Sequence, residues 1–123
     1  LFVTGVERPH GAERIALNGP DVQLSAKQVR ALRLVIHELA TNALKYGALS
    51  QPDGRIKVDW RIDDGGRIRI DWSELDGPKV AAPAMHNFGS RLILATLQQI
   101  GAELTPAFPE TGYCYRIVFA QKA

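Results

Sequence analysis

The chain has 123 residues, of which 46% are hydrophobic, with 15 Lys and Arg against 13 Asp and Glu. These values predict one compact domain with a single core, and a formal charge of +2 without a dense basic block argues against nucleic-acid binding. No apolar run approaches the roughly 20 residues of a membrane span, which argues against direct membrane contact. The lone Cys114 cannot form an intramolecular disulfide, which favours a reducing, cytoplasmic setting.

The first half of the chain predicts two short strands and one long helix. Residues 14–18 and 22–24 place apolar side chains around a turn at 18–20, a pattern typical of two short strands or one bent strand. Ser25 is suited to be the N-cap of a helix over residues 26–46 that stops at Gly47.

The second half predicts a hairpin, a loop, a helix and two more strands. Residues 55–62 and 67–72 alternate with period two around an Asp-Asp-Gly-Gly turn. Residues 75–89 hold two Pro and two Gly and predict a loop, after which a helix over about 90–100 and strands over 102–108 and 113–120 follow. The sum is an α+β fold: a two-layer α/β sandwich with a mixed, mainly antiparallel sheet and helices on one face.

Three polar residues of the long helix lie together beside its apolar stripe. At about 100° per residue, Glu38, Asn42 and Lys45 fall within about 60° of one another, at one edge of the stripe. They can be an ordinary i, i+4 polar pair with a solvated lysine beside it. They also combine a possible base, an amide oxygen for a hard cation and a cation for phosphate, which are the components of a magnesium-nucleotide site.

The stretch HELATNALKYGALS, residues 37–50, resembles the N-box of the GHKL ATPases and sensor kinases, and specifically the HWE family of bacterial histidine kinases. That family is marked by a His before the N-box Glu, here His37, and by a Trp-x-Glu, here Trp72 and Glu74. A third match is NFGSRLI, residues 87–93, which resembles the second glycine box, with Asn87 at a position where the family usually has Gly. The resemblance covers residues 14–119, and three motifs in order make it specific.

The resemblance implies a Bergerat-type ATP-binding fold and a set of roles for the helix. Asn42 would coordinate Mg²⁺, and Glu38 would order the waters of the metal ion or accept a proton during phosphoryl transfer. Lys45 would contact a phosphate. Tyr46 would place its ring against adenine, unless its position in the apolar arc makes it a core residue.

The two glycine boxes would complete the nucleotide site. Glu74 is the expected acceptor for the adenine amino group, with Asp76 as the alternative, and Gly77 would allow close approach of the backbone to the nucleotide. Residues 75–88 would form the ATP lid. Beyond the lid, backbone N–H groups at the N-terminus of the next helix, at Gly89 and Ser90, would bind phosphate, and Arg91 would reach the phosphates or an acidic neighbour.

The resemblance therefore predicts the catalytic ATP-binding domain of a two-component sensor histidine kinase, spanning residues 1–123, which transfers the γ-phosphoryl group of ATP to a histidine. Because the chain starts at Leu1 in what reads as the middle of a domain, we expect a fragment of a longer protein. The dimerisation and phosphoacceptor domain and the sensor domain would lie outside it. That acceptor domain and a downstream response regulator are the expected partners, and the full-length protein is expected to be a homo-oligomer.

Other interpretations remain open at this point. The chain can be a degenerate nucleotide-binding or protein-interaction module, a GHKL anti-sigma-type serine kinase, or a hydrolysing ATPase. Neither of the last two is expected to carry both His37 and the Trp72 and Glu74 pair. The histidines of the chain are not expected to be the phosphoacceptor, because the resemblance places that residue in a separate upstream domain. His37 points about 100° away from Glu38, and neither His10 nor His86 lies in a predicted helix.

Overall fold

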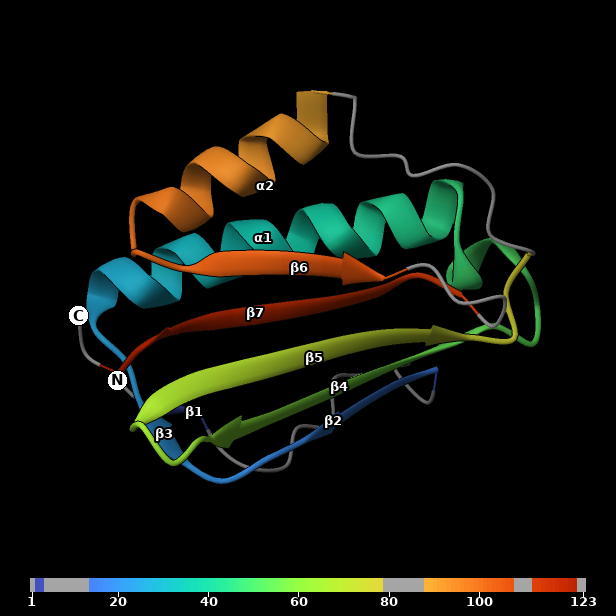
Figure 1. The fold of residues 1–123 in the computed structure, drawn as a ribbon. Coiled ribbons are helices and arrows are strands. Elements are labelled where there is room, and N and C mark those ends of the chain that lie inside the picture. Colours follow the sequence, from blue (N-terminus) through green and yellow to red (C-terminus); the bar gives the residue numbers. More distant parts are fainter. Residues whose placement is uncertain (1, 4–13, 79–87, 108–111, 122–123) are drawn as a thin grey trace.

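The computed structural model describes residues 2–3, 14–78, 88–107 and 112–121 (Figure 1). Groups of two or three strands are separated by helices along the chain, and helices α1 and α2 lie together on one side of the strands. In chain order the elements are β1 (Phe2–Val3), β2 (Ile15–Asn18), β3 (Val22–Gln23), α1 (Ala26–Lys45), the 3-10 helix η1 (Ala48–Ser50), β4 (Arg55–Ile62), β5 (Arg67–Leu75), α2 (Phe88–Gln98), β6 (Glu103–Ala107) and β7 (Cys114–Ala120).

A five-stranded sheet with the order β2-β4-β5-β7-β6 forms one layer. β2 runs parallel to β4, and the other neighbours are antiparallel. β3 pairs instead with β1 in a separate two-stranded sheet, so residues 14–18 and 22–24 contain two strands and not one bent strand. The expected α+β class, with a mixed and mainly antiparallel sheet and helices on one face, is confirmed.

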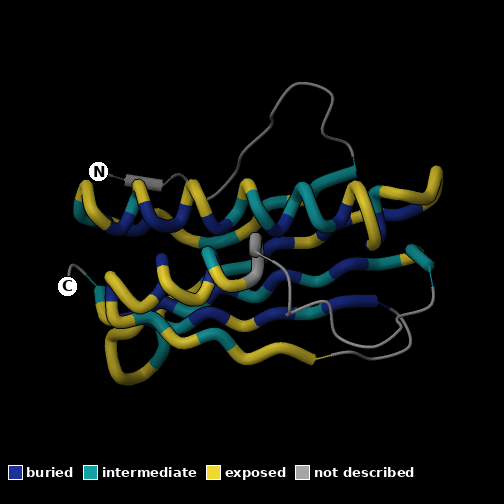
Figure 2. The backbone as a smooth tube through the Cα atoms, turned by 90° about the horizontal axis from the view of Figure 1, so that it is seen from above, coloured by how far each residue is buried: buried dark blue, intermediate teal, exposed yellow. Residues whose placement is uncertain are grey.

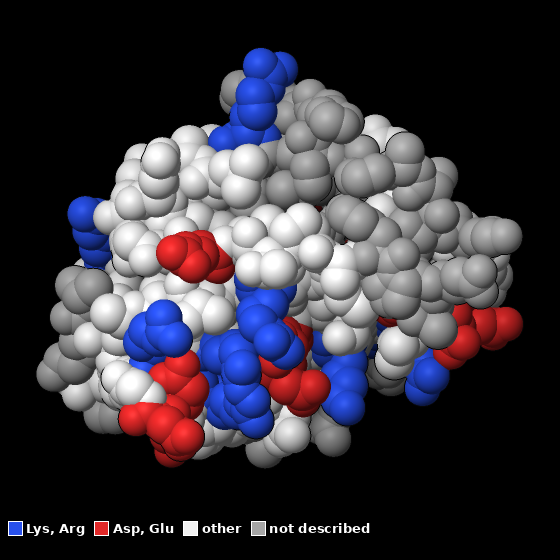
Figure 3. Space-filling model, viewed as in Figure 1, with Lys and Arg blue, Asp and Glu red and all other residues white. Residues whose placement is uncertain are grey.

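The alternation of side chains along β5 defines the two faces of the sheet. Residues 68, 70, 72 and 74 are buried beneath the helices, and the residues between them are more exposed. Figure 2 shows exposed and buried residues alternating along α1, as expected for a helix with one face packed and the other open to solvent. Lys, Arg, Asp and Glu side chains are interspersed over the strands in Figure 3, as expected for a solvated surface.

Helix α1 begins with a capping box. The Ser25 side chain accepts a hydrogen bond from the Gln28 backbone N–H at 3.1 Å, and the Gln28 side chain accepts one from the Ser25 N–H at 3.0 Å. The Gln28 amide is itself fully buried and donates to the Ala120 carbonyl at 2.9 Å. This bond joins the first turn of α1 to the end of β7, so the helix is held on the sheet by a directed contact as well as by apolar packing.

The structure moves several boundaries that the sequence predicts. α1 ends at Lys45 with Tyr46 as its C-cap, and a short 3-10 helix follows that the periodicity does not predict. β5 continues to Leu75, so Glu74 lies inside this strand, two residues beyond the predicted strand end at residue 72. α2 covers residues 88–98 instead of about 90–100.

Candidate functional site

Glu38, Asn42 and Lys45 lie along one flank of α1, as helix geometry requires. Glu38 and Asn42 are half-buried and Lys45 is exposed. By the same geometry, this flank lies on one side of the buried stripe of the helix, and Ala40, which lines a cavity described below, lies on the other side. α1 packs against α2, which itself contacts β6, so the second helix lies over the β6 side of the sheet.

The C-terminal end of α1 leads directly into the second part of the site. The Tyr46 N–H donates to the Asn42 carbonyl at 2.8 Å, and the Gly47 N–H donates to the Ala43 carbonyl at 3.1 Å. The Tyr46 side chain is 52% exposed, so it is not a core residue despite its position in the apolar arc. Its ring is accessible beside the site, as a role in stacking on a base requires.

Glu74 is buried directly beneath this end of the helix. Only 2% of the residue is exposed, and both carboxylate oxygens are occupied by protein donors. Oε1 accepts a hydrogen bond from the Ala48 backbone N–H at 2.9 Å, and Oε2 accepts one from the Trp72 indole Nε1–H at 3.0 Å. The Glu74 N–H donates to the Tyr113 carbonyl at 2.9 Å, so its main chain is also held. The structure thus joins the N-box end to the Trp-x-Glu motif.

Two effects act on the ionisation of the Glu74 carboxyl group. Burial raises its pKa, because a charged carboxylate loses hydration there. The hydrogen bonds from Ala48 and Trp72 act in the opposite direction but do not cancel the effect. The negative charge of Glu74 also contributes to the raised pKa of the buried Tyr115 hydroxyl, after burial itself.

Glycines allow the backbone segments around Glu74 to approach closely. A Cβ atom on Gly47 would lie 2.0 Å from Glu74 Oε1, and a Cβ atom on Gly112 would lie 2.1 Å from the Glu74 carbonyl oxygen. A Cβ atom on Gly77 would lie 2.6 Å from Ala48 Cα. These contacts are closer than real Cβ atoms make, so a side chain at any of the three positions would force the site apart. The close approach of Gly77 is to the protein's own chain at Ala48.

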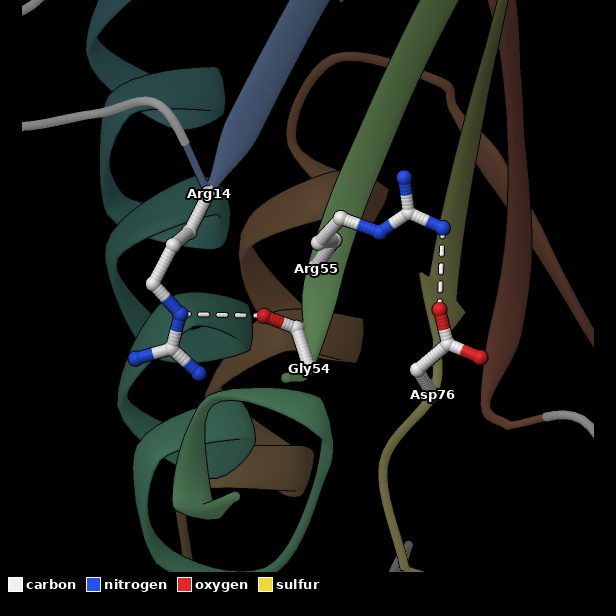
Figure 4. Close-up of polar contacts among 4 residues, drawn as sticks. All are labelled: Arg14, Gly54, Arg55 and Asp76. Atoms are coloured by element: carbon white, nitrogen blue, oxygen red, sulfur yellow. Dashed lines mark hydrogen bonds and ion pairs between the residues drawn. The ribbon is translucent and has the colours of Figure 1, made fainter. Parts of the chain in front are cut away.

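Two arginines support the edge of the site (Figure 4). The Arg14 Nε–H donates to the Gly54 carbonyl at 3.0 Å, and its Nη2 contacts the Gln51 carbonyl, which ties the start of β2 to the loop after η1. Arg55 forms an ion pair with Asp76 at 2.9 Å. Asp76 has φ 57°, a left-handed conformation that directs the chain out of β5 just after Glu74.

The second glycine box forms the first turn of α2. Gly89, Ser90 and Arg91 lie within this turn, whose backbone N–H groups have no partner inside the helix, and the Arg91 residue is exposed. Residues 79–87, including His86, Asn87 and most of the expected lid, lie outside the described residues, as does His10. His37 is exposed on α1, where its carbonyl accepts a hydrogen bond from the Thr41 hydroxyl.

A hollow of different character lies on the other flank of α1. It is an apolar cavity of about 530 Å³ between α1 and the β2 side of the sheet. Its lining includes Ile36 and Ala40 from α1, Leu17 from β2 and Trp60 from β4. Arg33 is the single charged residue of the lining. Glu38, Asn42 and Glu74 do not line this cavity.

Sequence reasoning missed two participants at the Glu74 site. The Ala48 amide could not be found from its side chain, because the group that binds is part of the backbone. Gly54 packs on the Ala48 carbonyl, where an added Cβ atom would lie 1.6 Å from the oxygen. One signal could have indicated that the backbone of the N-box approaches the first glycine box closely. Gly47 and Gly77 lie in these two motifs, which were expected to meet.

Among the described residues, no helix is both long and apolar enough to cross a membrane. No protein-family model matches the chain.

The chain is similar in sequence to two proteins named as blue-light-activated histidine kinases. Blue-light-activated histidine kinase 1 of Erythrobacter litoralis (strain HTCC2594) is 49% identical over 67 residues, covering 52% of this chain and 19% of the relative. Blue-light-activated histidine kinase of Brucella ovis is 40% identical over 105 residues, covering 82% of this chain and 22% of the relative. The chain therefore spans about a fifth of the length of these curated relatives.

Solved structures show the same fold. The histidine kinase domain of the Erythrobacter litoralis EL346 blue-light activated histidine kinase matches with a TM-score of 0.76 and 23% identity, over 91% of this chain and 53% of the other. The catalytic domain of histidine kinase ThkA matches with a TM-score of 0.62 and 14% identity, over 83% and 72% of the two chains. The chain is thus similar in sequence to bacterial histidine kinases over 82% of its length and shares the fold of their catalytic domains, and it carries the sequence marks of the HWE type at His37, Trp72 and Glu74.

Proposed function

We propose that the chain is the ATP-binding catalytic domain of a two-component sensor histidine kinase. It transfers the γ-phosphoryl group of ATP to a histidine on a separate dimerisation domain. The observation that carries the proposal is the contact of the end of α1, just after Asn42 and Lys45, with the buried Glu74 of β5. This contact supports one nucleotide site built from both motifs.

Glu38, Asn42 and Lys45 supply the phosphate end of the site. Asn42 offers an amide oxygen and Glu38 a carboxylate one turn earlier, so the donor set is oxygen and fits Mg²⁺. The described residues contain no group of three or more His, Cys, Asp or Glu that could hold a metal ion by itself. A site with one protein ligand, nucleotide phosphates and water fits this ion, which keeps several waters in most proteins.

The reaction needs positioning and neutralisation of charge more than covalent chemistry. Lys45, at the exposed end of the row, contacts a phosphate. Glu38 orders water or accepts the proton from the attacking imidazole. Mg²⁺, when held by Asn42, would supply positive charge that offsets the negative charge of the phosphates. The first turn of α2, with Gly89, Ser90 and Arg91, binds phosphate through its backbone N–H groups.

Tyr46 and Glu74 form the base end of the site. The ring of Tyr46, which is 52% exposed, packs on adenine. Each carboxylate oxygen of Glu74 has a further lone pair beyond the bond it makes to the protein, so Glu74 can still accept from the adenine amino group. Gly77 is held against Ala48, so its contribution is to keep this wall of the site narrow.

The remaining components of the system lie outside this domain. Residues 1–123 form one catalytic domain in a longer, cytoplasmic and homo-oligomeric sensor kinase. The acceptor histidine belongs to its own dimerisation domain, and a response regulator receives the phosphoryl group afterwards. The relatives support this arrangement, because the chain matches only about a fifth of their length.

A calorimetric titration of the chain with ADP, with and without Mg²⁺, tests the proposal. Wild type is expected to bind with magnesium dependence, and Asn42→Ala is expected to lose that dependence. Asn18→Ala is the matched control, because Asn18 is an exposed amide at the end of β2. Equal binding with and without Mg²⁺ would favour a degenerate nucleotide-binding module, and no binding would favour a protein-interaction module.

A further inference from the structure

We propose that Glu74 is a positioning residue that clamps the end of α1 to β5, with Trp72 holding its carboxylate in place. The clamp is a chain of two hydrogen bonds, from the Trp72 indole to Glu74 Oε2 at 3.0 Å and from the Ala48 amide to Glu74 Oε1 at 2.9 Å. Its effect on nucleotide binding rests on the proposed function, whereas the clamp itself can be measured without nucleotide.

Strand geometry accounts for the first bond. Trp72 and Glu74 are two residues apart in β5, so their side chains stand side by side on the inner face of the sheet. Both are 2% exposed, and the indole has one donor and no acceptor. Packing immobilises the Trp72 ring, and its N–H therefore fixes the direction of the neighbouring carboxylate.

The second bond fixes the helix end that carries the proposed phosphate ligands. Ala48 begins η1, one residue after Gly47. The amides of Tyr46 and Gly47 are bonded to the carbonyls of Asn42 and Ala43 at 2.8 and 3.1 Å, so hydrogen bonds hold the backbone between the clamp and Asn42. A shift of Ala48 would move the last turn of α1 and change where Asn42 and Lys45 point.

Glycine backbone packs closely against both ends of the clamp, at the Glu74 carboxylate and at Ala48. Gly47 has no space for a Cβ atom beside Glu74 Oε1, and both Gly54 and Gly77 press on the Ala48 backbone. A buried carboxylate is costly to desolvate, and an apolar side chain at this position would avoid that cost. What the carboxylate adds is direction, because its two oxygens meet two separate donors, the Ala48 amide and the Trp72 indole.

An amide in place of the carboxylate distinguishes the clamp from general burial. In Glu74→Gln, one side-chain oxygen remains, and the amide nitrogen is a donor that faces a second donor. Because packing immobilises the Trp72 ring, its N–H is expected to keep the remaining oxygen, and the bond to Ala48 is then lost. Adding Trp72→Phe removes the competing donor, so the double variant W72F/E74Q is expected to recover the bond to Ala48.

Amide hydrogen exchange of the whole 123-residue chain, followed by NMR without nucleotide, measures the hydrogen bond of the Ala48 amide directly. Exchange at Ala48 is expected to be about tenfold faster in E74Q than in wild type, the effect of one lost hydrogen bond. The rate is expected to return toward wild type in W72F/E74Q. Asp76→Asn is the matched control, because it removes a neighbouring carboxylate that is exposed and outside the clamp. Unchanged exchange in E74Q, or no recovery in the double variant, would overturn the proposal.

A nucleotide titration then separates clamping from recognition of the base. W72F leaves Glu74 unchanged, and a loss of affinity for ATP and for purine riboside triphosphate by the same factor, about three- to tenfold, is expected. The second nucleotide lacks the 6-amino group. If W72F binds both nucleotides with wild-type affinity, the clamp has no effect on nucleotide binding. Absence of wild-type binding would instead refute the proposed function and leave the exchange result standing.

Discussion

Gly47 and Glu74 come from two distant motifs and touch, because a methyl group on Gly47 would lie 2.0 Å from Glu74 Oε1. The same added atom would lie 3.2 Å from Ala43 Cα, so it could not move away by turning toward the helix. The backbone of the N-box therefore reaches the carboxylate of the first glycine box without an intervening side chain, which is what makes the hydrogen bond from Ala48 possible.

Gly47→Ala is accordingly expected to push the Glu74 carboxylate away and to destabilise the fold by about 1–3 kcal/mol, the cost of overpacking a closed site. ADP affinity should fall with it. Urea unfolding and the ADP titration measure the two effects. Gly65→Ala is the control, because a Cβ atom there meets only the Asp63 side chain, at 3.5 Å. Equal stability of the two variants would contradict the packing described.

The stability of the wild type is expected to fall, relative to Glu74→Gln, as pH rises from about 4 to 7. Burial raises the pKa of Glu74 above its ordinary value of 4.5, so the folded state holds this proton more tightly than the unfolded state does. The stability from this group is complete below 4.5 and is lost as pH rises through the higher folded-state pKa. Urea unfolding across this pH range measures the difference. A constant offset between the two proteins would show that Glu74 titrates alike in both states.

Two substitutions of Asp76 separate its backbone conformation from its ion pair. Asp76→Gly and Asp76→Ala both remove the ion pair with Arg55. Both side chains of this pair are 59% exposed, so the pair contributes under about 1 kcal/mol to stability. Only Gly adopts φ 57° without strain. The Gly variant is therefore expected to be more stable than the Ala variant by about 1 kcal/mol in thermal or urea unfolding. Identical stabilities would mean that the left-handed turn is not kept in solution.

Filling the apolar cavity beside α1 should stabilise the fold. Ala40→Leu places three more carbon atoms toward a cavity of about 530 Å³, and Leu is a good helix former. A gain of about 1 kcal/mol is expected from the apolar surface it buries. Ala95→Leu on the exposed face of α2 is the control and should change little. Loss of stability in Ala40→Leu would indicate that the cavity is already filled in solution.

Glu38→Gln is expected to keep nucleotide affinity within about threefold and to lower phosphoryl transfer by about 10²- to 10⁴-fold, the range for loss of a general base. Transfer of label from radioactive ATP to an isolated acceptor domain measures the rate, and calorimetry measures the affinity. Transfer at the full rate would exclude Glu38 as the base. Gln28, a buried amide in the same helix, should not be used as the control, because its bond to Ala120 holds the helix on the sheet.

Much of the fold could be predicted because its signals are local. The helix over residues 26–46 and the hairpin of 55–62 with 67–72 follow from periodicity and turn residues, and the structure departs from them by one to three residues. The parallel pairing of β2 with β4 and the separate pairing of β3 with β1 could not be predicted, because strand partners are chosen by packing between distant segments.

The candidate site divides in the same way. The flank shared by Glu38, Asn42 and Lys45 was predictable from helix geometry, and the resemblance to the N-box indicated its chemistry. The burial of Glu74 was not predicted, because the strand was expected to end at residue 72, whereas its alternation continues to Leu75. Whether Tyr46 contacts the base or belongs to the core stayed open from the sequence, and only the structure shows that the residue is exposed, at the C-cap of α1.

By itself the amino-acid sequence determined the class of fold, most of its elements and the resemblance to histidine kinases, since periodicity, turn chemistry and three ordered motifs are properties of short segments. Only the tertiary structure decided that the Ala48 amide, the Trp72 indole and the Glu74 carboxylate meet. The physical reason is that a backbone N–H has no signature in the sequence. Its partner is set by how closely glycine-containing segments from different elements pack against one another.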